Sequence, residues 1–176
     1  MATDRQKAET VHWHAVFTAS RAEKKVRDRL EELGVECFLP VQTVLRQWTY
    51  RKSRVVVPVI AGLVFVRVGR QEQVKVLQTK GVVAFLRLKG EAGAAGIPDK
   101  QMEDFRFLLD FSEEAVEMTN ENIKAGDLVR VVKGSLRGME GELIRHKGMT
   151  KVLVRIDMLG CTMVNIPASF VEKLNK

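Results

Sequence analysis

The segment "GDLVRVVKGSLRGMEGELI" (residues 126–144) decides the fold of the C-terminal part of the chain. It places four glycines and three basic residues among branched apolar residues. This pattern predicts a strand over 127–132, a turn over 133–138 and a second strand from Glu140. Gly134, Gly138 and Gly141 are expected at positive-φ or bulge positions, where a Cβ would clash. The basic residues that this turn presents to solvent or to a partner are Lys133 and Arg137.

Further strand-like runs follow, so that residues 122–176 contain five short apolar runs separated by turn residues. A sheet this small cannot protect its edges unless it closes on itself, and a small β-barrel is therefore expected. The preceding residues 112–121 are polar and acidic, and they predict a linker.

Upstream of the linker, "SRAEKKVRDRLEELG" (20–34) predicts an amphipathic helix. Ser20 is placed to cap it, Glu23 completes a capping box, and Gly34 ends it. The apolar stripe that this helix would bury consists of Ala22, Val26, Leu30 and Leu33.

The other elements of residues 1–111 are read from β-branched runs and from helical periodicity. They are strands over 12–19, 54–60, 62–68 and 82–88, an extended run over 35–48, and helices over 70–80 and 97–111. The order β–α–β–β–α–β–α indicates an antiparallel α+β sandwich. The sequence thus predicts two domains, 1–111 and 122–176, joined by the acidic linker 112–121.

Composition and charge limit the possible functions. Hydrophobic residues make up 45% of the chain, as in ordinary globular proteins, and no apolar run approaches the ~18 residues of a membrane helix. The N-terminus has no signal-peptide pattern, and the two cysteines lie far apart in the sequence, so we expect no disulfide framework and a cytoplasmic protein. We also expect a monomer. The formal net charge is +7, with basic ends around an acidic middle, and it fits either a polyanionic partner or simple solubility.

No enzymatic motif is recognisable. His12 and His14 lie two residues apart, but no third ligand accompanies them or Cys37 or Cys161 at a known metal spacing. The glycine-rich "GEAGAAG" (90–96) lacks the Lys-Ser/Thr that a phosphate-binding loop would have. We therefore expect neither catalysis nor a metal nor a cofactor.

The stretch "RQWTYRKSR" (46–54) surrounds two aromatic residues with four basic ones at an expected hairpin tip. Such a composition suits phosphate neutralisation combined with base stacking. The alternative is a solvated hairpin whose tryptophan covers the edge of the core. The candidate nucleic-acid-binding residues are Arg46, Trp48, Tyr50, Arg51, Lys52 and Arg54.

The stretch "AGDLVRVVKGSLRGMEGEL" (residues 125–143) resembles a KOW motif, the signature of SH3-like barrels in NusG-type transcription factors and some ribosomal proteins. The first part of the chain resembles the NusG N-terminal (NGN) domain in the right order, through "HWHAVFT", "AEKKVRDRLEELGVECFLP", "VIAGLVFVRV", "TKGVVAFLRL" and "IPDKQMEDF". Within this family, "LPVQTVLRQWTYRKSR" is most similar to specialised paralogues of the RfaH and UpxY type.

This resemblance implies a transcription elongation or antitermination factor that docks its NGN domain on the clamp helices of the largest catalytic RNA polymerase subunit. It implies suppressed pausing, and a hairpin that faces upstream DNA and the non-template strand. By motif position, the polymerase-binding candidates are Trp13, Phe17, Ile60, Leu63, Phe65 and Phe85. The alternative is that most of them are core residues, because strand side chains alternate and only one face can form the contact surface. Phe17, Leu63 and Phe65 are the best individual candidates. The segment "VIAGLVFV" is less aromatic than the family's version, and "RQEQVKVLQTK" lacks the His-Thr-Thr element of RfaH.

For the barrel, the resemblance implies a ribosomal protein, the termination factor Rho or RNA as partner. The alternative reading is a general RNA-binding or ribosome-associated KOW protein that does not act on the polymerase. The β-branched strands of the C-terminal part favour a permanent barrel over a helical alternative.

Overall fold

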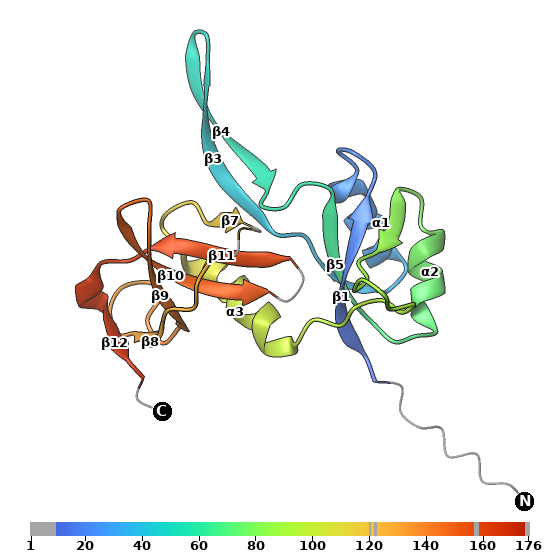
Figure 1. The fold of residues 1–176 in the computed structure, drawn as a ribbon. Coiled ribbons are helices and arrows are strands. Elements are labelled where there is room, and N and C mark those ends of the chain that lie inside the picture. Colours follow the sequence, from blue (N-terminus) through green and yellow to red (C-terminus); the bar gives the residue numbers. More distant parts are fainter. Residues whose placement is uncertain (1–9, 120, 122, 157–158, 175–176) are drawn as a thin grey trace, which may run out of the picture. The chain divides into compact units, whose positions relative to one another are not determined.

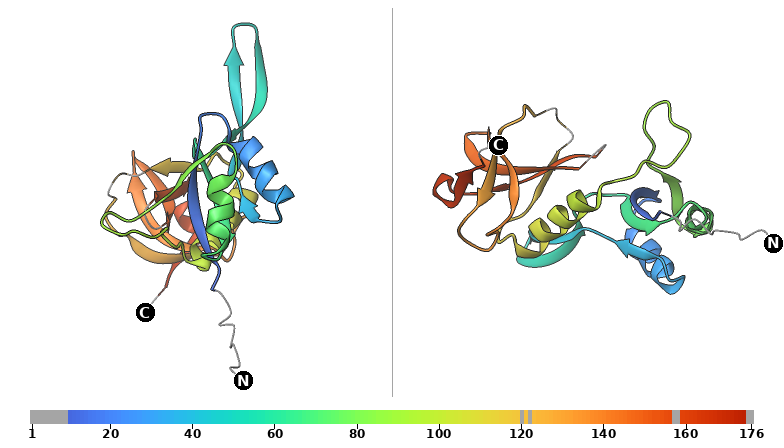
Figure 2. Two further views of the ribbon diagram at one scale, coloured as in Figure 1. Left: turned by 90° about the vertical axis from the view of Figure 1, so that its right-hand side faces the viewer. Right: turned by 90° about the horizontal axis from the view of Figure 1, so that it is seen from below.

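The computed structural model describes residues 10–119, 121, 123–156 and 159–174. The chain divides into two compact units (Figure 1, Figure 2). The N-terminal unit contains the chain through Leu39 together with Ala61–Pro98, and the β-rich unit contains Pro40–Ile60 and the chain from Asp99 onward. The chain therefore passes from one unit to the other three times.

From residue 10 onward, where the structure describes it, the N-terminal unit is a four-stranded antiparallel sheet with two helices packed on it. Its strand order is β2-β5-β1-β6. In chain order its elements are β1 (His12–Thr18), α1 (Glu23–Glu32), β2 (Glu36–Phe38), β5 (Leu63–Val68), α2 (Glu72–Gln78) and β6 (Val82–Phe85).

The two central strands of this sheet supply most of the core. β1 and β5 are buried along nearly their whole length, on both faces of the sheet. Val16 of β1 pairs with Val64 of β5, and neither side chain is accessible to solvent. Strands buried on both faces read as continuous apolar runs, which explains why "LVFV" does not alternate with polar residues.

Helix α1 differs from the prediction at both ends. It begins at Glu23, its N-cap is Ala22, and no side chain caps it, so the predicted capping box at Ser20 is wrong. The chain turns at Arg21, which has φ 58°, and the Glu23 carboxylate instead accepts a hydrogen bond from the backbone N–H of Gly62 at 2.7 Å. Leu33 lies beyond the last helical residue and is exposed, so it is not part of the buried stripe.

In the residues described, the β-rich unit consists of a six-stranded antiparallel sheet, a separate two-stranded ribbon and one α-helix. The order in the large sheet is β12-β8-β9-β10-β11-β7, and the ribbon is β3-β4. In chain order the elements are β3 (Val41–Trp48), β4 (Arg51–Pro58), α3 (Asp99–Phe111), β7 (Glu117–Thr119), β8 (Asp127–Val131), β9 (Glu140–His146), β10 (Met149–Ile156), β11 (Gly160–Asn165), a 3-10 turn (Ala168–Phe170) and β12 (Val171–Lys173).

Helix α3 packs with the β-rich unit. Its Leu108 has no exposed surface and belongs to the same apolar cluster as Val129, Val152 and Val164. The sequence groups this helix and the ribbon with residues 1–111, whereas the packing groups them with the C-terminal strands. The domain boundaries at 111 and 122 stay a prediction.

Part of the segment predicted as a linker is a strand. Residues 117–119 form β7, which pairs with β11 and extends the large sheet. The ammonium group of Lys151, whose side chain is 1% exposed, donates a hydrogen bond to the Glu117 carboxylate at 2.6 Å. A buried charge needs a counter-ion, so Glu117 stabilises the fold by neutralising Lys151.

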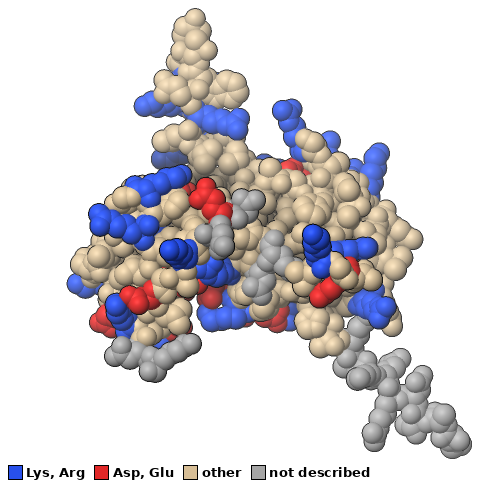
Figure 3. All heavy atoms as spheres, in the orientation of Figure 1, with Lys and Arg blue, Asp and Glu red and all other residues tan. Residues whose placement is uncertain are grey.

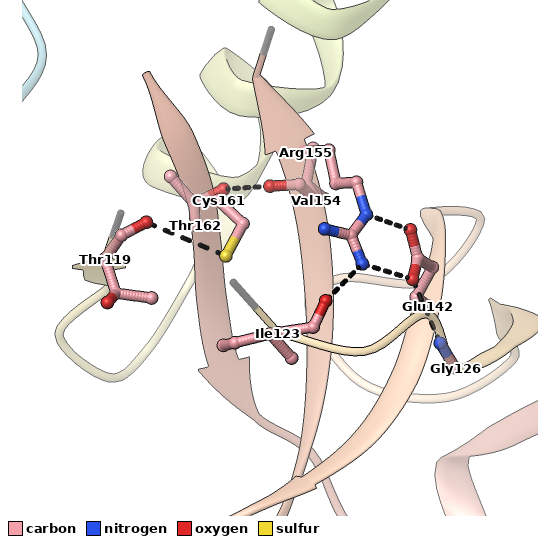
Figure 4. A network of polar contacts seen from close by, with 8 residues as sticks. All are labelled: Thr119, Ile123, Gly126, Glu142, Val154, Arg155, Cys161 and Thr162. Atoms are coloured by element: carbon pink, nitrogen blue, oxygen red, sulfur yellow. Dashed lines mark hydrogen bonds and ion pairs between the residues drawn. The ribbon is translucent and has the colours of Figure 1, made fainter. Parts of the chain in front are cut away.

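A second polar network fastens the chain after β7 to the sheet (Figure 4). Glu142 of β9 accepts two hydrogen bonds from the Arg155 guanidinium of β10, at 2.6 and 2.9 Å, and a third from the backbone N–H of Gly126 at 3.0 Å. The same guanidinium donates to the carbonyl oxygen of Ile123 at 3.0 Å. A bidentate carboxylate–guanidinium pair fixes geometry as well as charge, so the entry into β8 is held in place.

These two pairs predict acid sensitivity of the β-rich unit. The hydrogen bond from Lys151 lowers the pKa of Glu117, and the hydrogen bond from Arg155 lowers the pKa of Glu142. A carboxyl whose pKa is lower in the folded than in the unfolded state stabilises the fold above its unfolded pKa, and it loses this contribution as the pH falls through the folded pKa. We expect the unfolding temperature of this unit, measured by calorimetry, to fall as the pH is lowered below about 5.

The control for this prediction is the double variant Glu117→Gln and Glu142→Gln. It should be less stable than the natural chain at neutral pH and should change less on acidification. An unfolding temperature of the natural chain that stays constant over the acid range would contradict the prediction.

Candidate functional site

The six residues predicted to form an apolar contact surface separate into a buried and an accessible group. Phe17 is 41% exposed, and Ile60 is partly exposed. The other four are at most 4% exposed and belong to the core in this structure, as the alternative reading expects: Trp13, Leu63, Phe65 and Phe85.

Position in the sheet explains the difference. Phe65 pairs with Ala15 in the middle of the sheet, where the strands are buried on both faces. Phe17 pairs with Leu63 and with Ala84 one residue before β1 ends, and its ring reaches solvent. Of the six candidates, Phe17 at the end of β1 is therefore the most accessible, and Ile60 is partly accessible.

A bulge brings a second apolar side chain to the same point of the sheet. Phe17 pairs with Ala84 and Thr18 pairs with Val82, so Val83 has no partner of its own in this register. A bulge redirects its extra residue, and Val83 is 64% exposed. We call Phe17 and Val83 the apolar edge.

Sequence reasoning missed Val83, because the bulge depends on pairing with a strand more than sixty residues away. It also missed the exposed side of α2, where Val74 and Leu77 are three residues apart and both accessible. The sequence did contain a signal for them, because two apolar residues three positions apart lie on one face of a helix.

The ribbon formed by β3 and β4 carries all six candidate nucleic-acid-binding residues. Its register pairs Trp48 with Arg51 and Arg46 with Ser53. Because directly paired residues share a face and neighbouring pairs alternate, these four lie on one side, which we call the tryptophan face. The opposite side, the leucine face, contains Leu45, Gln47, Lys52 and Arg54.

The predicted set is thus divided by the ribbon. Arg46, Trp48 and Arg51 lie on the tryptophan face, and Lys52 and Arg54 lie on the leucine face. Tyr50 is in the turn between the strands and is 97% exposed. The alternative of a tryptophan that covers the core is not observed, because the Trp48 side chain is 56% exposed.

The ribbon is a strongly positive element. It extends away from the six-stranded sheet (Figure 1), and on the side shown in Figure 3 it carries basic side chains and no acidic ones. No Asp or Glu occurs between Glu36 and Glu72, and in the described part of the chain its four basic residues form no ion pair. Uncompensated cations on an exposed ribbon attract polyanions.

The turn between β8 and β9 has the predicted form. Gly134 and Gly138 have φ values of 81° and 94°, a region that favours glycine. Lys133 and Arg137 are both exposed at this turn. The predicted clash of an added Cβ is present at Gly141, where it would lie 2.8 Å from a backbone oxygen of β10, although Gly141 is not among the glycines with a positive φ. At Gly138 an added Cβ meets no heavy atom within 4 Å, so the clash predicted there is absent.

One histidine and one cysteine of the N-terminal unit have shifted pKa values that burial explains. Nδ1 of His14 donates to the carbonyl oxygen of Ala95 at 2.8 Å, and burial lowers the pKa of this histidine. Burial raises the pKa of the Cys37 thiol to about 11, so little reactive thiolate forms at neutral pH. Among the described residues, no three His, Cys, Asp or Glu side chains gather as a metal site would require.

Helices in the described part of the chain are too short or too polar to cross a membrane.

Comparison with known proteins gives the following matches. The family model described as "NusG: Transcription termination factor nusG" matches residues 11–106. A solved structure described as "Domain interaction in Thermotoga maritima NusG" has 23% identity and a TM-score of 0.48, and the alignment covers 94% of this chain and 98% of that one. A structure of an MjSpt4:Spt5 complex has 17% identity and a TM-score of 0.31, with 93% and 97% covered. No curated protein matches the chain.

Proposed function

The chain belongs to the NusG family of non-enzymatic transcription factors, and we propose from this premise that it is an elongation or antitermination factor that binds RNA polymerase. Its N-terminal unit would contact the clamp helices of the largest catalytic subunit and suppress pausing or termination in the cytoplasm. The observation that carries this proposal is the accessible apolar edge, which lies within the residues that the family model matches.

The apolar edge supports contact with the tip of a coiled coil. An exposed aromatic side chain beside a second exposed apolar one can anchor a partner if the contact excludes water. Phe17 has this character, and Val83 lies beside it on the adjacent strand. The four buried candidates would support this surface from below, because they hold the sheet in shape.

The test is capture of a clamp-helix fragment of the polymerase by the full chain. We expect the natural chain to retain the fragment and Phe17→Ala to weaken binding by at least about tenfold, as for an interface hot spot. Leu128→Ala is the matched control, because Leu128 is 42% exposed but belongs to β8. Failure of the natural chain to bind, or equal effects of the two substitutions, would contradict the proposal.

The ribbon would add a nucleic-acid contact. Its four uncompensated cations and two exposed aromatics support binding to the non-template strand at the polymerase. The β-rich unit would recruit a second partner, such as a ribosomal protein, Rho or RNA, with Lys133 and Arg137 exposed for such a contact. Specialisation for particular operons, as in RfaH- and UpxY-type paralogues, belongs to the same proposal.

A further inference from the structure

We propose that the tryptophan face of the ribbon is a stacking site for one unpaired base, with Ser53 as the residue that positions the stacking ring. This inference rests on the proposed function only for the source of the strand. The site consists of Trp48 between Arg46 and Arg51, and the leucine face takes no part in stacking.

The first argument is the hydrogen bond of the indole. Nε1 of Trp48 donates to the hydroxyl oxygen of Ser53 at 3.0 Å, across the ribbon and on the same face. An indole has a single polar hydrogen, so this bond uses its entire capacity to donate. The remaining interactions of the exposed ring are those of its apolar edge and its π-faces. A ligand of Trp48 is therefore recognised by stacking.

The second argument is preorganisation. The ring would otherwise turn freely at the surface, and a binding partner would have to immobilise it. Ser53 is half-buried in β4 and ties the ring to a paired strand. The bond thus lowers the entropy that stacking would cost. Tyr50, although more exposed, has no such restraint among the described contacts.

The third argument is the arrangement of charge around the ring. Arg51 is directly opposite Trp48, and Arg46 is two residues before it on the same face, about 7 Å along the strand. A base that stacks on the indole would bring its flanking phosphates near these two guanidinium groups. Lys52 and Arg54 point to the other side, so they attract the polyanion at longer range only.

This chemistry selects an unpaired base. In a duplex the faces of the bases are covered by their neighbours, whereas every base of a flexible single strand has a face to offer. The shared ligand chemistry is a single strand of DNA or RNA, and stacking alone does not distinguish the four bases.

The test is binding of a fluorescently labelled 12-nucleotide single-stranded DNA to the full chain without polymerase. The affinity is measured by fluorescence anisotropy of the label, and stacking by the tryptophan fluorescence of chains that keep Trp48. The chain has two tryptophans, and Trp13 is 4% exposed, so quenching reports on Trp48. We expect quenching, together with a loss of affinity of between about fivefold and 100-fold in Trp48→Ala. Trp48→Phe should restore most of the affinity, and Ser53→Ala should show a smaller loss with weaker quenching.

A charge-matched pair of double variants separates stacking from simple attraction. One double variant combines Arg46→Ala with Arg51→Ala, and the other combines Lys52→Ala with Arg54→Ala. Each removes two positive charges. The first should weaken binding more, because it removes contacts at the ring. Equal losses in the two double variants, no effect of Trp48→Ala, or binding of a duplex as tight as that of the single strand would overturn the inference.

Two further arms complete the design. Tighter binding of the DNA strand than of an RNA of the same sequence assigns the ligand to a displaced DNA strand, and the reverse assigns it to a transcript; stacking is supported in both cases. A chain that captures polymerase but does not bind the oligonucleotide overturns this inference and leaves the proposed function intact. A chain that binds the oligonucleotide but not polymerase supports this inference and contradicts the proposed function.

Discussion

Phe65→Ala is expected to lower the free energy of unfolding of the N-terminal unit by about 3–5 kcal/mol. The side chain has no exposed surface, and it lies on a central strand that is buried on both faces. Its removal leaves a cavity that the sheet cannot close without moving β1 or β2, which both pair with β5. Calorimetry of the full chain would show the lower unfolding temperature of this unit.

Phe17→Ala is the control for the predicted loss of stability in Phe65→Ala. Phe17 belongs to the same predicted contact set, but it is 41% exposed, so its removal should change the unfolding free energy by about 1 kcal/mol or less. Polymerase capture should respond in the opposite order, with Phe17→Ala defective although folded. If Phe65→Ala left stability unchanged, the assignment of Phe65 to the core would be wrong.

Gly141→Ala is expected to destabilise the β-rich unit by about 2–3 kcal/mol. An added Cβ would lie 2.7 Å from Cγ1 of Val152 and 2.8 Å from the carbonyl oxygen of Leu153. The oxygen belongs to the backbone of β10, so relief of the contact requires β9 and β10 to separate. The unfolding transition of this unit, followed by calorimetry, measures the effect.

Gly93→Ala is the matched control for this substitution. An added Cβ at Gly93 meets no heavy atom within 4 Å, and a change within about 0.5 kcal/mol is expected. Similar effects of the two substitutions would show that the loss at Gly141 has another origin than the close approach of the strands.

Local patterns predicted the elements well. The segment 126–144 formed β8, a glycine turn and β9 as expected, because turn residues and β-branched runs act over a few positions. The helical periods over 70–80 and 97–111 gave α2 and α3, each somewhat shorter than predicted. The hairpin tip at 46–54 was also correct, since two strands there meet through a two-residue turn.

Features that depend on distant partners could not be predicted in this way. The strand β7 is three residues long, and its Glu117 is explained by Lys151, which lies 34 positions away. Nothing near Glu117 in the sequence distinguishes it from the other acidic residues of that segment. The same holds for Glu23, whose partner Gly62 is 39 positions away.

The contact surface was the least predictable feature. Trp13, Leu63 and Phe65 have the residue types of an apolar contact face, but the same types fill a core. Their accessibility depends on what covers the sheet, which periodicity along one strand does not reveal. Val83 became accessible through a bulge, and a bulge is a property of two strands together.

The ribbon has a dynamic consequence. The described strands β3 and β4 pair only with each other, and a two-stranded sheet is marginally stable in water. Its amide groups near the tip are therefore expected to open far more often than those of the central strands, and to exchange their hydrogens sooner. A bound nucleic-acid strand would suppress this opening, so part of its binding free energy would be used to order the tip. The same mobility would allow the tip to adapt to strands of different conformation.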